Sequence, residues 1–310
     1  MAWACAGVRW VEGRPELRWF GVGRGERGSA LGFGQELAFV ARGERRCVGV
    51  WRAGRRTPCP TGAGVPGRGT RDQCAECARI DRSFSVAADT NAGDQRPYAV
   101  YLAWFGPGLL KVGITGVRRG PARLQEQGAV AFAWLGRGPL MAARRAEELL
   151  GAALKVPDRI PYARKRAARF GLPPIDARVA ELRDCHARAV ALTGWPDSLE
   201  RVEFEPVDQS GVFGLDGMGE ASGVRVVREL VDGGGVAGRL VGAAGPDLCL
   251  RPKDGGGTVV LDGRLLSGWR LVAVDAVDAV DAEWAAGVSV PVEPLVARDG
   301  ESGGVQGGLF

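Results

Sequence analysis

The sequence predicts an α+β protein organised around a central β-hairpin. The stretch that begins at Tyr98 reads YAVYLAWFGPGLLKVGIT, two alternating apolar runs interrupted by Gly106-Pro107-Gly108. The chain then continues to Leu154 with a helical segment, a short apolar strand and a longer helix. Short strand-like runs cut by glycines occupy both flanks, as in RWVEGRPELRWFGVG before the hairpin and GRLVGAAG after it. The central unit is therefore expected to have the order hairpin, helix, strand, helix.

The three-residue loop fixes the register of the hairpin. It places Tyr101 opposite Gly113 and Ala103 opposite Lys111 on one face. That face offers a phenol, an ammonium group and a gap where glycine has no side chain, which suits a bound substrate. The other face is expected to be a core surface made of five apolar residues, Val100, Leu102, Trp104, Val112 and Ile114.

Each of the two following helices carries one charged residue of interest. Arg123 lies in the first turn of the helix that Pro121 begins. In the second helix Glu147 falls within the apolar stripe, whereas Glu148 lies on a solvated face with local ion pairs. An inward carboxylate requires a cation, either an arginine or a metal ion. The alternative is a glutamate at the edge of the stripe that extends to water.

The central segment resembles the GIY-YIG nuclease superfamily in its order of elements and in its motifs. The first strand contains AVY at residues 99–101, which matches GIY through its tyrosine. The second strand contains KVG at residues 111–113, which matches YIG with lysine in place of tyrosine. Arg123 matches the arginine of the superfamily, and Glu147 matches its glutamate.

This resemblance implies a catalytic set of Tyr101, Lys111, Arg123 and Glu147. In the superfamily the arginine binds the scissile phosphate and the glutamate holds one divalent metal ion, so Mg²⁺ or Mn²⁺ is implied at Glu147. Lys111 departs from the usual second tyrosine, although some active restriction enzymes of the superfamily resemble this chain in using lysine there. No equivalent of the asparagine that often follows the glutamate is evident.

A second resemblance covers most of the chain. Three separated segments look like the bacterial domain-of-unknown-function family 2797, in its actinobacterial type. They are VYLAWFGPGLLKVGIT followed by PARLQEQGA, a cysteine-bearing segment before it, and GRLVGAAGPDLCL near the end. Because the family is defined without an activity, this resemblance leaves the chemistry to be argued from the residues.

Composition and charge describe the broad class of protein. The 310 residues are 45% hydrophobic and 25% charged, as in a soluble globular protein of two or three domains. A net charge of +5 favours polyanionic partners, DNA or RNA. No apolar run is long enough to span a membrane, and the N-terminal MAWACAGVRWVEG lacks the features of a secretory signal. A cytoplasmic protein is therefore expected.

The chain divides into four expected segments. Residues 1–97 hold a small antiparallel sheet and a cysteine-rich, zinc-ribbon-like segment, and residues 98–200 hold the central unit with the basic helices that follow it. Residues 201–284 read as a small all-β module. Residues 285–310, which end ESGGVQGGLF, are expected to be a disordered tail.

Four cysteines, Cys47, Cys59, Cys74 and Cys77, lie in a segment crowded with Arg, Pro and Gly. Such a segment has few core residues, and four thiolates around a structural Zn²⁺ ion would stabilise it. The alternative is a set of unconnected buried or surface thiols, because only one Cys-x-x-Cys pair is present. Cys47 is the weakest of the four candidate ligands.

Basic residues follow the second helix of the central unit, and aromatic residues lie among them. Arg164, Lys165, Arg166 and Arg169 are candidates for contact with a nucleic-acid backbone. The alternative is a solvated helix face whose aromatic residues point inward. A further helix, from about Ile175 to Leu192, carries the single histidine, which is expected to be structural.

The leading hypothesis from the sequence is a metal-dependent nucleic-acid phosphodiesterase of GIY-YIG type. Tyr101 would activate or orient water, while Lys111 would lower the pKa of the phenol or bind a second phosphate. Two alternatives remain open at this point. The first is a nuclease-like core that binds nucleic acid or a nucleotide without hydrolysis, and the second is a zinc-containing adaptor protein.

Overall fold

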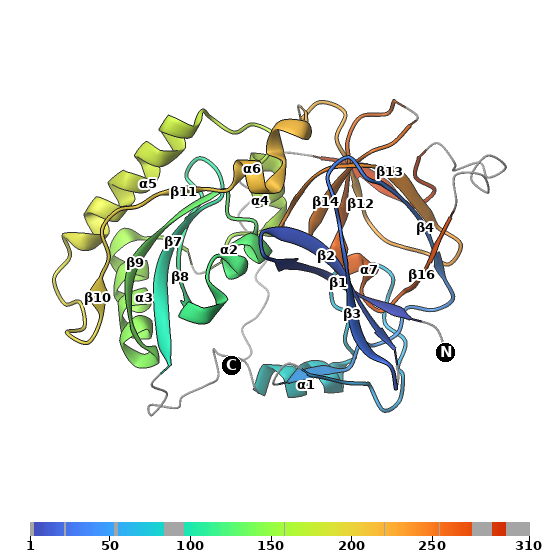
Figure 1. Ribbon diagram of the computed structural model, residues 1–310, viewed down its shortest axis with the longest axis horizontal. Coiled ribbons are helices and arrows are strands. Elements are labelled where there is room, and N and C mark those ends of the chain that lie inside the picture. The colour runs from blue at the N-terminus through green and yellow to red at the C-terminus, as the bar shows by residue number, and fades with distance from the viewer. Residues whose placement is uncertain are drawn as a thin grey trace.

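A computed structural model describes residues 3–21, 23–52, 55–83, 96–157, 159–219, 221–253, 255–274 and 287–295. It is a mixed α+β structure with several sheets, in which strands predominate (Figure 1). The sheet of the central unit lies on one side of the molecule, and the sheets built from the two ends of the chain lie on the other (Figure 1). The Val-Asp-Ala repeat at 275–281 lies outside the described residues.

The predicted hairpin is confirmed. Strand β7 (Pro97–Trp104) pairs antiparallel with β8 (Leu110–Gly116), with Tyr101 opposite Gly113 and Ala103 opposite Lys111. In the sheet β7 lies between β8 and β9 (Ala131–Pro139), and β8 forms one edge. Two short strands, β10 (Glu200–Arg201) and β11 (Val207–Asp208), pair with the far side of β9.

Helices cover both faces of this sheet. Helices α3 (Leu140–Leu154) and α5 (Ile175–Val190) pack on the face that carries Val100, Leu102 and Trp104. This face is the expected core surface. The shorter helices α2 (Ala122–Gln127) and α4 (Tyr162–Ala168) pack on the face that carries Tyr101. Between β8 and α2 lies a single 3₁₀ turn, η1 (Val117–Arg119). Glu181 of α5 accepts hydrogen bonds from the Trp104 indole, at 2.6 Å, and from the Gly108 amide in the hairpin loop, at 2.8 Å.

The two β-rich flanks share one sheet. A seven-stranded sheet has the order β16-β4-β13-β14-β15-β12-β17, so β4 (Glu36–Arg42) from the first segment lies among strands of the last. Its other strands are β12 (Arg225–Val227), β13 (Gly235–Ala244), β14 (Asp247–Arg251), β15 (Val259–Asp262), β16 (Arg270–Ala273) and β17 (Val292–Pro294). The boundaries expected at 97 and 201 therefore do not separate the two flanks.

The expectation of a disordered tail from 285 onward is wrong for residues 287–295. Strand β17 pairs antiparallel with β12, and Val290 is buried. Apolar residues of this segment complete the edge of the sheet, a long-range pairing that local composition does not reveal. Residues 296–310 lie outside the described part of the chain.

Three strands before residue 31 form a separate antiparallel sheet. Its strands are β1 (Ala4–Val11), β2 (Arg14–Gly21) and β3 (Gly25–Ala30). The indole of Trp10 donates a hydrogen bond of 2.7 Å to the carbonyl of Gly245, next to β14. Near the seven-stranded sheet lie three short helical turns, α6 (Ser210–Phe213), η2 (Leu215–Gly217) and α7 (Gly263–Leu266).

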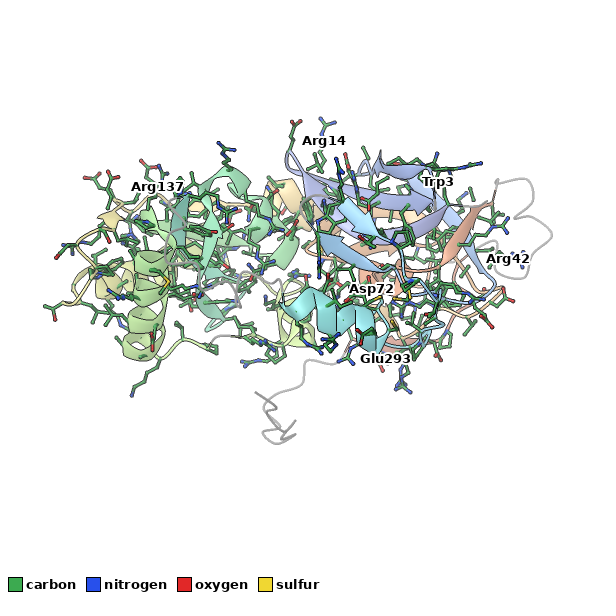
Figure 2. All side chains as sticks on the ribbon, turned by 90° about the horizontal axis from the view of Figure 1, so that it is seen from below. Trp3, Arg14, Arg42, Asp72, Arg137 and Glu293 are labelled. Carbon is green, nitrogen blue, oxygen red and sulfur yellow. The ribbon has the colours of Figure 1, made fainter. Side chains whose placement is uncertain are left out.

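The cysteine segment contains a two-stranded ribbon, β5 (Val50–Arg52) and β6 (Arg55–Thr57), and helix α1 (Ala75–Ser83). Arg45 connects the cysteine segment to the rest of the protein. Its buried guanidinium donates hydrogen bonds to the carbonyls of Pro66, Gly69, Arg264 and Ser267. The hydroxyl of Ser267 also donates to Asp72, which lies above α1 in Figure 2. Among the described residues, no helix is long and apolar enough to cross a membrane.

Candidate hairpin site and cysteine cluster

Tyr101 and Gly113 together create the candidate site. The two residues pair across β7 and β8, and the Tyr101 ring lies over the position that a side chain at 113 would occupy. A Cβ on Gly113 would stand 2.8 Å from Cε2 of Tyr101 and closer still to the hydroxyl oxygen. Because β8 is an edge strand, the missing side chain lets the phenol reach toward the rim of the sheet.

The phenol of Tyr101 is held in place by neighbours on the same face. Gln127, at the end of α2, donates a hydrogen bond of 2.8 Å to its hydroxyl oxygen, and Trp134 of β9 meets its ring edge-on. Burial raises the pKa of Tyr101, and the hydrogen bond from Gln127 opposes this only in part. The expectation of a lowered phenol pKa is therefore wrong, since desolvation outweighs the neighbouring positive charge. The phenol keeps its proton at neutral pH and can donate it in a hydrogen bond.

Arg123 and Glu147 act on this phenol from helices on opposite faces of the sheet. The charge of Arg123, on α2, lowers the pKa of Tyr101, while the charge of Glu147, on α3, raises it. Charges influence a pKa in this way only over short distances. Both helices therefore carry a charge that acts on the phenol, although they cover opposite faces of the sheet.

Glu147 and Glu148 differ in their surroundings. Glu147 is half-buried, and Glu148 is exposed, as the helical stripe predicted. Both line an open hollow of ≈ 570 Å³, together with Arg144 and the turn at Pro157. The half-buried carboxylate therefore has an opening beside it through which an ion or a substrate can approach.

Lys165 adds a buried amine to this region. Its ammonium nitrogen lies 3.7 Å from the centre of the Phe105 ring, and its side chain is almost fully buried. Burial, together with the positive charges of Lys111, Arg169 and Arg123, lowers the pKa of Lys165 to about 7. Lys165 thus lies within electrostatic range of two predicted site residues, Lys111 and Arg123.

The structure brings the four cysteines of the predicted zinc segment together. The sulfur atoms of Cys47, Cys59, Cys74 and Cys77 all lie within 4.8 Å of one another. Four thiolates in tetrahedral contact with zinc, at bonds of about 2.3 Å, have sulfurs about 3.8 Å apart, so a small inward movement completes the geometry. The cluster can hold a zinc ion.

The surroundings of the cluster suit thiolate ligands. Backbone amides of Gly49 and Cys74 donate to the sulfur of Cys47 at 3.4 and 3.2 Å, an arrangement that stabilises negative charge on sulfur. A hydrogen bond with the Thr61 hydroxyl lowers the pKa of Cys59 to about 6. Burial raises the pKa of Cys47, because a thiolate is poorly solvated there. A bound cation would stabilise the thiolate form of these four cysteines.

Comparison with known proteins gives a family without an assigned activity. The model of the family described as "Protein of unknown function (DUF2797)" matches residues 34–271, which is most of the chain. The chain belongs to the DUF2797 family. No curated protein and no solved structure matches it. The region shared with DUF2797 contains both the cysteine cluster and the hairpin site, while β1–β3 precede it.

The basic helix of this DUF2797 chain is arranged differently from the sequence-based expectation. Arg166 pairs with Asp247 at 2.6 Å and with Asp262 at 3.0 Å, and Arg169 pairs with Asp247 at 2.8 Å. These ion pairs join α4 to the seven-stranded sheet, and Lys165 is buried beside them. An open phosphate-binding surface does not fit such burial, because the guanidinium groups already have carboxylate partners. Arg164 alone of the four candidates is exposed.

Sequence reasoning missed Gln127 and the placement of Lys165. Gln127 lies four residues after Arg123, on the same face of α2, and this spacing was the available signal. The inward direction of Lys165 depends on Phe105, which is sixty residues away in the sequence, so no local pattern reveals it. His186 is buried on α5 and its ring meets Phe204 edge-on, which agrees with a structural role.

Proposed function

We propose that this protein is a metal-dependent nucleic-acid phosphodiesterase whose central sheet is a GIY-YIG-type nuclease domain. The observation that carries the proposal is the placement of Tyr101, whose hydroxyl accepts a hydrogen bond of 2.8 Å from Gln127. The charges of Arg123 and Glu147 both act on this phenol. A phenol, a guanidinium and a half-buried carboxylate beside an open hollow form a set suited to a phosphodiester.

Each residue has a defined task in this proposal. The partly exposed guanidinium of Arg123 binds the scissile phosphate and neutralises the charge that develops on its oxygens. Tyr101 keeps its proton and orients the attacking water or a phosphate oxygen by donating a hydrogen bond, while Gln127 fixes the direction of that donor. Lys111, on the same face as Tyr101, binds a second phosphate oxygen.

The donor set at Glu147 fits a divalent cation of the Mg²⁺ type. Magnesium in nucleotide-processing sites is commonly held by one or two carboxylates, substrate phosphates and water. Glu147 supplies one carboxylate beside the hollow, and Glu148 lies next to it. When bound, Mg²⁺ or Mn²⁺ supplies Lewis-acid stabilisation of the phosphate and of the departing oxygen.

A cleavage panel tests this function. Purified protein is incubated with single-stranded, duplex and branched DNA and RNA, with Mg²⁺ or Mn²⁺, and compared with Glu147→Ala and with Glu148→Ala as a matched control. We expect cleavage that requires the added metal and falls at least 100-fold in Glu147→Ala alone. Activity unchanged in Glu147→Ala would refute the proposed site, and a loss in Glu148→Ala alone would assign the metal to Glu148.

A second candidate function is nucleic-acid binding without hydrolysis. It is favoured by Lys111, which replaces the second tyrosine of the nuclease motif with a phosphate-binding cation. Under this alternative the same panel gives binding but no product on any substrate.

We also propose that the cysteine cluster holds a structural zinc ion in the folded protein. Its small core contains Cys47, Val50 and Cys77 with few other apolar residues. The ion would therefore provide much of the stability of residues 47–83 and fix α1 against β5.

A further inference from the structure

A second cavity, distinct from the hollow at Glu147, opens at the edge strand β8. It measures ≈ 650 Å³ and reaches from the start of β7 across the end of β8 and η1 to α2. Four arginines line it, Arg96, Arg118, Arg119 and Arg123, and we call it the arginine pocket. Arg123 also belongs to the candidate hairpin site, so the arginine pocket and that site share this residue.

The charges of the arginine pocket suit an anion. None of the described residues that line it is acidic. Glu126 of α2 forms an ion pair with Arg119, and its carboxylate lies 4.0 Å from the guanidinium of Arg123. Three arginines of the arginine pocket, Arg118, Arg119 and Arg123, outnumber this one carboxylate, so the arginine pocket carries a net positive charge. Guanidinium groups bind phosphate in paired hydrogen bonds.

The walls of the arginine pocket are apolar. Tyr98 and Ile114 line it from the β7–β8 ribbon, together with Pro97 and Val117. A volume of ≈ 650 Å³ falls in the usual range of small-molecule sites, about 300–1,000 Å³. It is large enough for one nucleotide but not for a base-paired duplex. A base can contact the apolar wall only if it has left a base stack.

Positive charge continues beyond the arginine pocket toward the N-terminal sheet. Arg9 of β1 lies close enough to Arg119 and Arg18 for their charges to act on it, and its guanidinium lies over the ring of Trp51 at 4.8 Å. Trp51 also lines a second hollow, together with Arg55, Arg56 and Glu26, and Glu26 pairs with Arg56 at 2.8 Å. A chain of phosphates that leaves the arginine pocket toward β1 therefore meets Arg9 and the ring of Trp51.

We propose that the arginine pocket binds an unstacked nucleotide adjacent to the scissile phosphate, so that the ligand of this protein is a single-stranded polynucleotide. The inference rests on the proposed function for the position of the scissile bond at Arg123. Arg96 and Arg118 contact phosphates next to that bond, and the wall of Tyr98 and Ile114 contacts the base. Duplexes are bound only where their ends or loops expose such a nucleotide.

Binding without turnover tests this inference. Glu147→Ala protein, in buffer without added divalent metal, is titrated into fluorescent 12-nucleotide single strands of DNA and RNA and into the matching blunt duplexes, and anisotropy is recorded. The same titration is made with Arg96→Ala/Arg118→Ala in that background. Arg188→Ala, at an exposed arginine of α5 that does not line the arginine pocket, is the matched control. Circular dichroism and Tm verify that each variant is folded.

We expect single strands to bind at least 10-fold more tightly than duplexes. The double variant should weaken single-strand binding at least 10-fold and reduce the slope of log Kd against log salt by about 1.4, the value for two lost phosphate contacts. Arg188→Ala should change neither. Equal affinity for duplex and single strand, or unchanged binding in a folded double variant, overturns the inference.

The outcomes separate this inference from the proposed function. If single-strand binding depends on Arg96 and Arg118 but no substrate is ever cleaved, the arginine pocket stands and the phosphodiesterase proposal fails. If cleavage depends on Glu147 but binding and cleavage survive in the double variant, the phosphodiesterase proposal stands and the arginine pocket falls.

Discussion

The hydroxyl of Tyr101 occupies the space that any side chain at Gly113 would need. The position of the phenol therefore depends on glycine at residue 113. We predict that Gly113→Ala forces the aromatic ring out of position and destabilises the protein by about 1–3 kcal/mol, the usual cost of overpacking. The same change should abolish cleavage, because the ring cannot move without losing the hydrogen bond to Gln127.

Denaturant unfolding and the cleavage assay check this prediction. Gly116→Ala is the matched control, because it lies in the same strand with open space around its Cβ and an ordinary φ of −61°. A Gly113→Ala protein as stable as Gly116→Ala and as active as the wild type would show that the contact with Tyr101 is unimportant.

The buried amine of Lys165 predicts a pH-dependent stability. Its pKa is lowered to about 7 in the folded protein, from an ordinary value of 10.5, chiefly by burial. Between these values the unfolded chain binds a proton that the folded chain does not, so stability rises with pH through this window. Below pH 7 the full cost of burying the charge is present.

We therefore expect Lys165→Met to stabilise the protein at pH 6.5 and to lose this advantage steadily toward pH 10. Tm measured across this range for the wild type, Lys165→Met and the exposed control Lys155→Met checks it. A difference in Tm between wild type and Lys165→Met that does not vary with pH would contradict the lowered pKa.

Asp247 connects Arg166 of α4 and Arg169, the residue after this helix, to the seven-stranded sheet, and its side chain is fully buried. Asp247→Asn should cost about 3–5 kcal/mol of unfolding free energy, because the guanidinium groups of Arg166 and Arg169 lose a buried countercharge. Glu293→Gln, in the exposed pair with Arg228, is the control and should cost about 0–1 kcal/mol. Urea unfolding measures both. A loss in Asp247→Asn no larger than in the control would mean that the ion pairs do not join these parts of the fold.

The cysteine cluster predicts one zinc ion per chain. Elemental analysis of purified protein should give a zinc-to-protein ratio near 1, and Cys74→Ser should reduce it sharply, whereas Cys185→Ala, a buried thiol outside the cluster, should retain it. A chelator should lower Tm, because metal binding and the folding of residues 47–83 are coupled. Zinc-free protein with an unchanged Tm would contradict a structural ion.

Much of the central unit can be read from the sequence because its contacts are local. The alternation of apolar residues and the three-residue loop fixed the register of β7 and β8, including the pairing of Tyr101 with Gly113. The helical stripe separated Glu147 from Glu148 correctly. The DUF2797 match confirms the family resemblance.

Other features could not be read because they depend on residues far apart in the chain. Nothing local in Glu36–Arg42 shows that this strand enters a sheet with Gly235–Ala244, and nothing local in 292–294 shows that it pairs with β12. The basic run of α4 looked like a free surface because the partners of Arg166, Asp247 and Asp262, follow 81 and 96 residues later.

By itself, the sequence determined which residues share a strand, a turn or a helical stripe, since these depend on spacings of two to four residues. Only the tertiary structure decided which charges are neutralised, which are buried and which remain open to a ligand. The physical reason is that a side chain's pKa and reach depend on everything packed around it. For Tyr101, Lys165 and Arg166 those neighbours come from distant parts of the chain.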